Sequence, residues 1–388
     1  MKRLLPISIR WRGGSGGIAH RAAGVKRLLR LSLLALCAGS FGPAAATVYE
    51  VETVAGGLAF PWSLAFLPGG DMLVTEREGR LRIIRDGRLD PTPIAGVPDT
   101  YARGQGGFFD ILLDPDFAAN RQVYLSYSEG ARRANRLVVG RARFDGAALS
   151  GFEAILIGEP DKDTPHHYGG RMAFLADGTL LIVSGDGFDY REQALDLGSL
   201  LGKTLRIGPD GSIPRDNPFL DRDGARPEIW TYGHRNQQGI VATPDGVYLH
   251  EHGPRGGDEL NRIEPGKNYG WPAITYGMDY SGSYISPYTE HPGMEQPVLV
   301  WTPSIAPAGL AYYDGEAFPE WKGDLFVAAL VERSVRRVDL EDGKPAGQDI
   351  LFTELGERLR DVRAGPDGYL YLLTDSATGS VLRVRPAL

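Results

Sequence analysis

The stretch Val362-Arg-Ala-Gly-Pro-Asp-Gly-Tyr-Leu-Tyr-Leu-Leu-Thr374 shows the pattern that decides the fold. An apolar segment leads into a Pro-Asp-Gly turn, and a second segment, rich in aromatic and aliphatic residues, ends in threonine. Gly, Pro and Asp favour tight turns, and short apolar runs between them favour strands. The stretch therefore predicts two short strands joined by a turn.

This pattern recurs six times along the chain, at about 57 residues per copy, which exceeds the 40–45 residues of a minimal propeller blade and leaves room for long loops. A closed ring of blades has no long exposed sheet edges. We therefore predict an all-β fold over residues 47–388, a single six-bladed β-propeller of four-stranded antiparallel blades. A β-sandwich with a second domain is the alternative, although no linker-like change in composition divides the chain. The copies begin at Leu64, Ile111, Met172, Ile240, Leu310 and Val362.

Composition and the two ends of the repeat array agree with this prediction. The chain has 52 Gly and 27 Pro among 388 residues, which is more than average and shows no collagen-like period. In such rings an N-terminal strand can complete the last blade. We expect residues 48–54 to pair in this way with Val381-Leu-Arg-Val-Arg385.

The first 46 residues have the features of a secretory signal peptide. They contain eight Lys and Arg and no Asp or Glu, then an apolar run from Leu31 to Cys37 and small residues up to Ala46. This order predicts cleavage after Ala46 and a periplasmic or secreted protein. The basic region is long, so translation from near Val25 is an alternative start. Cys37 is the only cysteine of the chain, and we expect no disulfide in the mature protein.

Charge and hydropathy exclude several classes of partner. Without the signal peptide, 34 Lys and Arg stand against 49 Asp and Glu, a net charge of −15. An acidic surface repels phosphate groups, so binding to nucleic acid or to anionic lipid is disfavoured. No stretch after residue 46 reaches the roughly 18 apolar residues of a membrane span. Neutral small molecules and cations are the expected ligands.

Seven short strings of polar residues, most of them flanked by glycines, lie at comparable places in the repeats. In a propeller, the loops at one end of the ring surround a central pocket, and glycines let the backbone approach a ligand closely. A single string of this kind is more often a turn than a binding site, but seven together indicate a site. They are Gly104-Gln-Gly-Gly107, His166-His-Tyr-Gly-Gly-Arg171, Gly185-Asp-Gly187, Tyr232-Gly-His-Arg-Asn-Gln-Gln-Gly239, Glu251-His-Gly-Pro-Arg-Gly-Gly-Asp-Glu-Leu260, Pro303-Ser-Ile-Ala-Pro307 and Arg358-Leu-Arg-Asp361.

These strings, together with Asn268-Tyr-Gly-Trp-Pro272, resemble the motifs of soluble aldose sugar dehydrogenases that use pyrroloquinoline quinone (PQQ), the glucose/sorbosone dehydrogenase family. The resemblance covers residues 57–386. It implies an oxidoreductase that converts the anomeric hydroxyl of an aldose to a lactone by hydride transfer to PQQ. A quinone or a cytochrome would then accept the electrons. The preferred sugar, and the choice between a monomer and a homodimer, stay open.

Loss of hydride from an alcohol requires a base that takes the hydroxyl proton, and histidine has a suitable pKa. Neighbouring residues on a strand point to opposite faces, so only one of His166 and His167 can face the pocket. The resemblance selects His167 as the base and Asp186 as the residue that orients it. It also implies that Arg235 is the cation beside the reacting quinone oxygen. Without the resemblance, Asp186 is equally well explained as a turn residue.

The resemblance implies further residues that bind cofactor and substrate. Arg358 and Arg360 alternate on one strand face and suit the three carboxylates of PQQ, although a solvated strand face explains the same spacing. One departure concerns Val331, which stands where glucose dehydrogenases of the family have a lysine against the cofactor. Either Arg333, which we favour, or another group compensates for it, or the cofactor is bound less tightly. The remaining matches are Gln105 near the substrate, and Asn236, Tyr280 and Ser304 near the cofactor.

Calcium is implied by the same motifs. A hard dication prefers oxygen ligands, including backbone carbonyls. Gly253 and Pro254 match residues whose carbonyls hold the active-site ion of the family, and Glu259 and Tyr269 match a second, structural site. A zinc site at His250 and His252 is the alternative, because the two residues lie on one strand face.

Two other functions fit a six-bladed propeller. A calcium-dependent lactonase would bind the ion through side-chain carboxylates and amides and would not need the pair Arg358 and Arg360. A non-catalytic binding propeller, as in hedgehog-interacting proteins, could lack His167 or Arg235, and both are present. The sequence therefore favours the dehydrogenase.

Overall fold

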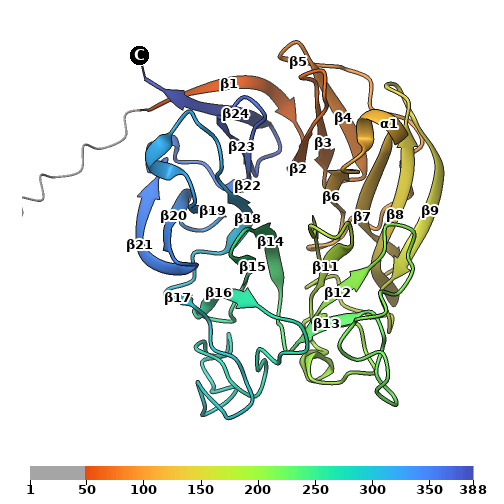
Figure 1. Ribbon diagram of the computed structural model, residues 1–388, viewed down its shortest axis with the longest axis vertical. Coiled ribbons are helices and arrows are strands. Elements are labelled where there is room, and N and C mark those ends of the chain that lie inside the picture. The colour runs from red at the N-terminus through yellow and green to blue at the C-terminus, as the bar shows by residue number, and fades with distance from the viewer. Residues whose placement is uncertain (1–48, 388) are drawn as a thin grey trace, which may run out of the picture. The chain divides into compact units, whose positions relative to one another are not determined.

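The computed structural model describes residues 49–387. These residues form six four-stranded sheets arranged in a ring, a six-bladed β-propeller, which confirms the predicted fold (Figure 1). The predicted signal peptide, including Cys37, lies outside the described residues and stays a prediction. Within residues 49–387, the structure has no helix that is long and apolar enough to cross a membrane.

Each blade is antiparallel, and its strands follow one another from the centre of the ring outwards. Blade one contains β2 (Pro61–Phe66), β3 (Met72–Glu76), β4 (Arg80–Arg85) and β5 (Arg88–Leu89); blade two contains β6 (Phe108–Leu113), β7 (Gln122–Ala131), β8 (Ala134–Phe144) and β9 (Leu149–Ile157). Blade three contains β10 (Gly169–Phe174), β11 (Leu180–Ser184), β12 (Lys203–Ile207) and β13 (Ile229–Tyr232); blade four contains β14 (Gln237–Thr243), β15 (Gly246–Glu251), β16 (Asp258–Ile263) and β17 (Leu299–Trp301). Blade five contains β18 (Pro307–Tyr312), β19 (Leu325–Ala329), β20 (Ser334–Glu341) and β21 (Lys344–Leu351); blade six contains β22 (Leu359–Ala364), β23 (Leu370–Thr374), β24 (Gly379–Pro386) and β1 (Tyr49–Leu58). Short helices lie in the loops: α1 (Phe117–Asn120), η1 (Arg191–Ala194), η2 (Pro319–Trp321) and η3 (Thr353–Leu355).

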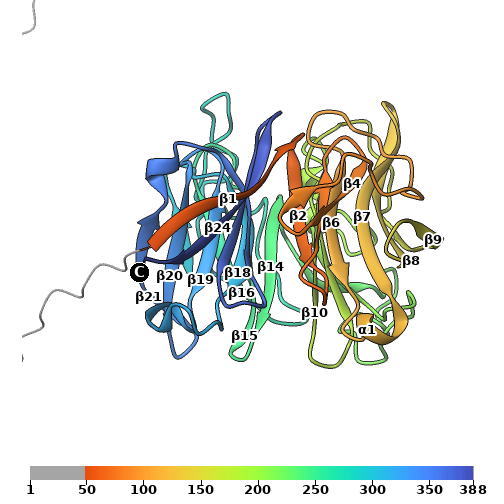
Figure 2. The same ribbon diagram turned by 90° about the horizontal axis from the view of Figure 1, so that it is seen from above.

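The sixth blade closes the ring with strands from both ends of the described chain. β1 pairs antiparallel with β24, with Tyr49 opposite Pro386 and Val51 opposite Val384. The two strands lie side by side in both ribbon views (Figures 1 and 2). The predicted pairing of the N-terminal and C-terminal strands is therefore confirmed from residue 49 onwards.

The six innermost strands, β2, β6, β10, β14, β18 and β22, contact one another in that order around the centre of the ring. Each of them has a break in register within its first few residues. Such bulges re-aim side chains and are common next to active sites. All six breaks lie at the end of the ring where the inner strands begin, so a binding site is expected at that end.

Apolar side chains fill the wedges between neighbouring blades. Between blades five and six, Phe318, Trp321 and Phe326 form part of one buried cluster, and the Phe318 and Trp321 rings stack with their centres 4.1 Å apart. Burial of apolar surface stabilises a fold by about 25 cal/mol per Å². This packing holds each blade against its neighbours and fixes the ring.

Four charged side chains meet at the centre of the ring, and we call Asp110, Arg171, Asp361 and Arg363 the axial charge cluster. Arg363 lies 2.9 Å from Asp110 and 2.9 Å from Asp361. Arg171 lies 2.9 Å from Asp361 and 3.4 Å from Asp110. Both aspartates are at most 1% exposed. Because a buried charge is costly unless it is paired, each member of the cluster needs its partners.

The axial charge cluster contacts all six blades. Its members come from β6, β10 and β22, and Arg171 also donates hydrogen bonds to the carbonyl oxygens of Trp62 on β2 (3.3 Å) and Gln238 on β14 (3.1 Å). In blade five, a Cβ atom on Gly309 would lie 2.2 Å from Oδ1 of Asp361. Glycine is therefore required at this point of β18, because the carboxylate occupies the space of a side chain.

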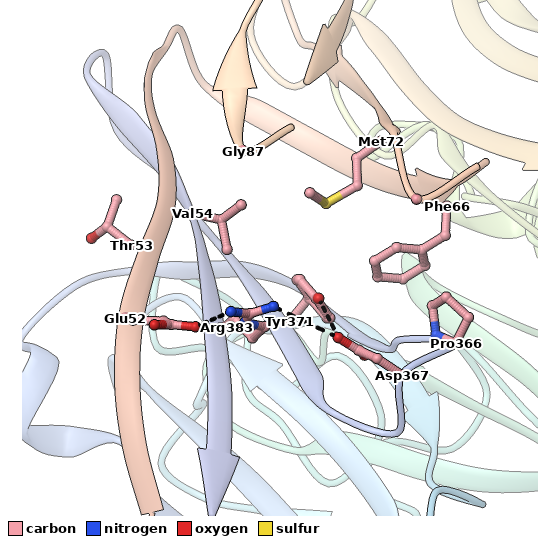
Figure 3. Close-up of a pocket in the computed structure, with 11 residues that line it drawn as sticks. Glu52, Thr53, Val54, Phe66, Met72, Gly87, Pro366, Asp367, Tyr371 and Arg383 are labelled. Atoms are coloured by element: carbon pink, nitrogen blue, oxygen red, sulfur yellow. Dashed lines mark hydrogen bonds and ion pairs between the residues drawn. The ribbon is translucent and has the colours of Figure 1, made fainter. Parts of the chain in front are cut away.

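A groove of about 490 Å³ lies between blades six and one, near the ends of the inner strands away from the bulges (Figure 3). The Phe66 ring of blade one contacts the Tyr371 ring of blade six with 4.8 Å between their centres. The polar groups of the groove are paired with one another, since Arg383 donates to Glu52 (2.6 Å) and Tyr371 donates to Asp367 (2.8 Å). The groove is thus part of the seam that closes the ring.

The axial charge cluster predicts a large stability loss in Asp110→Asn. Removal of one partner from a buried ion pair costs about 3–5 kcal/mol, because the opposite charges stay buried without compensation. The free energy of unfolding, measured by urea titration with circular dichroism, should fall by about 3–5 kcal/mol. Glu316→Gln is the control, because the Glu316–Lys322 pair is on the surface and such pairs contribute little. Equal midpoints for wild type and Asp110→Asn would contradict the assigned role of the cluster.

Candidate functional site

A cavity of about 270 Å³ lies at the end of the ring where the inner strands begin. Every blade contributes to it, as predicted for a propeller site. Four of the residues expected to bind ligand from the sequence, Gln105, Asn236, Arg358 and Arg360, line it together. The other lining residues are Trp62, Arg77, Phe109, Tyr168, Gly169, Gln238, His252, Ala306, Leu330 and Asp375.

His167 and Asp186 form a buried pair next to this cavity. Nδ1 of His167 lies 2.6 Å from Oδ1 of Asp186, and both side chains are at most 4% exposed. The Asp186 carboxylate also accepts hydrogen bonds from Nε1 of Trp271 (2.7 Å) and from the backbone N of Phe188 (2.7 Å). Because the carboxylate accepts from Nδ1–H, Nε2 of His167 is left as the free proton acceptor.

The loop before β10 fixes the orientation of His167. Its backbone has φ = 50°, an uncommon value for a residue other than glycine. The backbone N of His167 donates to Oε1 of Gln105 (2.8 Å), which ties the loop to blade two. Gln105, predicted to lie near the substrate, is therefore next to His167.

The protonation of His167 follows from its surroundings. Burial lowers the pKa of His167 to about 4. The charge of Asp186 acts in the opposite direction, and the positive charge of Arg235 acts in the same direction as burial. At neutral pH the imidazole is uncharged and able to accept a proton.

Arg235 lies beside the same pair. Its backbone O accepts a hydrogen bond from the backbone N of Asp186 (2.7 Å). Its Nη1 donates to the carbonyl oxygens of His252 (3.0 Å) and Gly253 (2.8 Å), and its guanidinium carbon lies 5.3 Å from the centre of the Trp271 ring. Nε of Arg235 is buried and has no hydrogen-bond partner among the described residues. A fixed positive charge with a free donor is thus available to an anionic group.

Arg358 and Arg360 both reach the cavity, and both contact Asp375. Arg358 donates to Asp375 through Nε (3.1 Å) and Nη2 (3.0 Å), and Arg360 lies 3.4 Å from the same carboxylate. Nε of Arg360 is buried without a hydrogen-bond partner in the described part of the chain. One aspartate neutralises one of the two arginines, so the pair retains a positive charge.

Three residues predicted to touch the cofactor, Arg235, Tyr280 and Ser304, lie outside the lining. Tyr280 is 59% exposed, and its hydroxyl lies 3.4 Å from Nη2 of Arg235. Ser304 donates to Oδ2 of Asp258 (2.6 Å), and Ala306 is the residue of that loop that lines the cavity. Asn236 is buried and lines the cavity, and its side-chain oxygen accepts a hydrogen bond from Gln238 (3.0 Å).

The residues proposed for calcium differ in how well they fit a cation. The Gly253 carbonyl already accepts from Arg235 (2.8 Å), so a cation bound there would share the oxygen with a guanidinium. Pro254 follows it and is buried. The Glu259 carboxylate fits better, because its one hydrogen bond in the described chain is the 3.4 Å contact from Asn261. Desolvation and the charge of Glu251 raise the pKa of Glu259 to about 8.

Glu259 also borders a small cavity. Its volume is about 10 Å³, and Glu251, Gly257 and Tyr269 border it as well. This is space for one water-sized species, and two adjacent carboxylates favour a hard cation there. The Tyr269 ring stacks on His234 with 4.8 Å between centres, and its hydroxyl donates to the Arg262 carbonyl (3.1 Å).

The two histidines of the zinc alternative bind backbone carbonyls of blade five. Nε2 of His250 lies 3.4 Å from the Gly309 oxygen, and Nε2 of His252 lies 2.7 Å from the Pro307 oxygen. Across residues 49–387, no three His, Cys, Asp or Glu side chains are grouped as metal ligands would be. The zinc alternative is therefore not supported.

Sequence reasoning missed Arg77, Asp375 and Leu330, which all line the cavity. They share a place in the repeat, directly after the second strand of a blade, where β3, β23 and β19 end. Asp186 and His252 follow the second strands of blades three and four in a similar way. Alignment of the repeats on this position would have identified Arg77, Asp375 and Leu330.

Comparison with known proteins gives a consistent result. A family model described as glucose/sorbosone dehydrogenase matches residues 58–383. The aldose sugar dehydrogenase YliI of Escherichia coli is 42% identical over 359 residues, which cover 90% of this chain and 96% of the relative. The crystal structure of the soluble aldose sugar dehydrogenase from Escherichia coli in the apo-form has a TM-score of 0.84 at 42% identity and covers 87% of this chain and 100% of its own. The PQQ-bound form of an aldose sugar dehydrogenase from Streptomyces coelicolor has a TM-score of 0.71 at 31% identity and covers 88% of this chain and 100% of its own.

The buried His167–Asp186 pair predicts how His167 titrates. In a nuclear magnetic resonance titration, the ring should remain neutral, with the proton on Nδ1, from pH 8 down to about pH 5, since burial lowers its pKa to about 4. Asp186→Asn should lower the pKa further, because the carboxylate charge favours the protonated ring. A His167 pKa near the ordinary value of 6.5, or a rise in Asp186→Asn, would contradict this account.

Proposed function

The chain belongs to the glucose/sorbosone dehydrogenase family, and we propose that it is a PQQ-dependent aldose sugar dehydrogenase. Its similarity to aldose sugar dehydrogenases supports the assignment as an oxidoreductase that acts on sugars. It oxidises the C1 hydroxyl of a cyclic aldose to the lactone, with PQQ as hydride acceptor. The observation that carries the proposal is the buried His167–Asp186 pair, at 2.6 Å, beside a cavity with unpaired arginine donors.

The chain's own residues supply the proton chemistry. Nε2 of His167 takes the proton of the C1 hydroxyl, which strengthens hydride donation from C1. The Asp186 carboxylate holds the ring in the required tautomer and stabilises the imidazolium that forms. Burial keeps the imidazole neutral before the reaction, since it lowers the pKa of His167 to about 4.

The cationic cavity is suited to hold the cofactor. Arg358 and Arg360 would bind carboxylates of PQQ, Asn236 would contact it from blade four, and Arg235 would lie near the oxygen that gains charge. PQQ held in this way would supply the acceptor for the hydride from C1. Arg235, Ser304 and Tyr280 lie outside the lining of the cavity, so their contact with the cofactor requires a movement of their side chains or loops.

Calcium is the second proposed cofactor. Glu259 and Tyr269 would hold a structural ion, which would favour the ionised form of Glu259 beside Glu251. The carbonyls of Gly253 and Pro254 would hold an ion near the quinone, where it would act as a Lewis acid. An ion at that place would lie next to Arg235, because the Gly253 carbonyl accepts from its guanidinium, and the two positive charges would act together on an anionic cofactor.

The remaining parts of the proposal concern the surroundings of the reaction. Gln105, next to His167, would contact the sugar. The onward electron acceptor is a quinone or a cytochrome, the protein is a monomer or a homodimer, and the signal peptide directs it to the periplasm or the exterior. A calcium-dependent lactonase is disfavoured, because it would not need the pair Arg358 and Arg360, and both arginines line the cavity.

Reconstitution tests the cofactors. We expect apoprotein to reduce an artificial dye in the presence of an aldose only when PQQ and Ca²⁺ are both added, and NAD to give no activity. The absorbance spectrum of the bound quinone should change when sugar is added. Full dye reduction by protein freed of both components would refute the cofactor assignment. The absence of any turnover, together with tight binding of another macromolecule, would favour the binding-propeller alternative.

Substitution of the neighbouring histidines tests the base. His167→Ala should lower kcat by about 10²–10⁴-fold, which is the usual contribution of a general base, with little effect on the Kd for PQQ. His166→Ala is the matched control, because His166 lies on the same loop and makes no contact with Asp186. Retained turnover in His167→Ala with loss in His166→Ala would show that the neighbour is the base.

A further inference from the structure

Val331 replaces a lysine that contacts the cofactor in glucose dehydrogenases of the family, and the sequence suggests Arg333 as its substitute. Val331 is 62% exposed and is not part of the cavity lining. Arg333 is exposed, and its Nη1 donates to the carbonyl oxygen of Gly356 (3.0 Å). Neither residue supplies a charge to the cavity, so the expectation for Arg333 is not supported by its position.

Arg77 is the third arginine that lines the cavity. It directly follows β3 in blade one, and its guanidinium carbon lies 4.6 Å from the centre of the Phe60 ring. No hydrogen bond or ion pair of its side chain is present among residues 49–387, whereas Arg358 and Arg360 share the Asp375 carboxylate. Arg77 therefore contributes a positive charge that the protein does not neutralise.

The stem of Arg77 is held in place by its neighbours. A Cβ atom on Gly107 would lie 2.5 Å from Cγ of Arg77 and 2.4 Å from its backbone oxygen, so the Gly107 backbone packs directly against the arginine. The backbone N of Phe108 donates to the Arg77 carbonyl (2.9 Å). These contacts lower the entropic cost of binding an anion, because the side chain is already oriented.

The charges of the cavity lining show the kind of ligand that fits. Three arginines stand against one aspartate. The chain as a whole has a net charge of −7. A concentrated positive charge in an acidic protein favours a small ligand with more than one carboxylate, and arginine binds carboxylates with paired donors.

We propose that Arg77 binds a carboxylate of the quinone cofactor, in the role that the lysine has in glucose dehydrogenases. Arg77 lies on blade one and the pair Arg358 and Arg360 on blade six, and the inner strands β2 and β22 of these blades are neighbours. The three cations thus bind one polycarboxylate from two adjacent blades. This inference rests on the proposed PQQ dependence and adds a residue to the cofactor site.

Direct binding of PQQ tests the inference without reliance on turnover. PQQ is titrated into apoprotein at fixed Ca²⁺, and the Kd is read from the quenching of tryptophan fluorescence and from calorimetry. Arg77→Gln should weaken binding by about ten- to a hundredfold, which corresponds to the 1.5–3 kcal/mol of a hydrogen bond to a charged group. Arg333→Gln is the matched control and should leave the Kd unchanged. Val331→Lys should also leave it unchanged, because Arg77 already meets the carboxylate.

The outcomes separate two statements, that the protein binds PQQ and that Arg77 contributes to this binding. If wild type does not bind PQQ, the cofactor assignment fails and the inference fails with it. If wild type binds PQQ and Arg77→Gln binds it equally well, or if Arg333→Gln shows the loss instead, the role of Arg77 is refuted and the cofactor assignment stands. Circular dichroism checks the fold of Arg77→Gln. Arg77→Lys keeps the charge and loses the paired donors, so it should show an intermediate Kd, and this variant decides the question if Arg77→Gln is unstable.

Discussion

Neutralisation of charge at the centre of the ring is the constraint on which the rest of the structure depends. The two arginines and two aspartates of the axial charge cluster are paired only when β6, β10 and β22 have come together. Asp110 and Arg363 are 253 positions apart in the chain. Because a buried charge without a partner is destabilising, the pairing in this cluster stabilises the completely closed ring. Closure also brings the starts of all six inner strands around one cavity.

The axial charge cluster and the cavity are adjacent but have different charges. The guanidinium carbon of Arg171 lies 4.0 Å from the ring of Trp62, which lines the cavity. The cluster contains equal numbers of positive and negative groups, whereas the lining contains three arginines and one aspartate. The positive charge is therefore available to a ligand. Next to it, burial keeps His167 neutral, so a proton acceptor lies beside an anion-binding surface.

Much of the fold could be predicted because each repeat contains its own turn and strand signals. The six copies, the four-stranded blades and the pairing of β1 with β24 all follow from local pattern and from the need to cover sheet edges. The pairing of His167 with Asp186 agrees with the resemblance. Ser304 and Tyr280 were expected to contact the cofactor, yet their side chains lie outside the cavity lining, because Ser304 bonds to Asp258 and Tyr280 points largely to solvent.

The sequence by itself determined the architecture, because strand periodicity and turn chemistry are local properties. Its polar strings carried the resemblance to the family. It did not reveal that Asp110, Arg171, Asp361 and Arg363 form one cluster, since these residues are far apart in the chain and look like ordinary strand positions. Nor did it show that Arg77 lines the cavity while Arg333 bonds to Gly356. Only the tertiary structure decided these points, because ring closure sets which strand ends face a common centre and which charges remain without a partner.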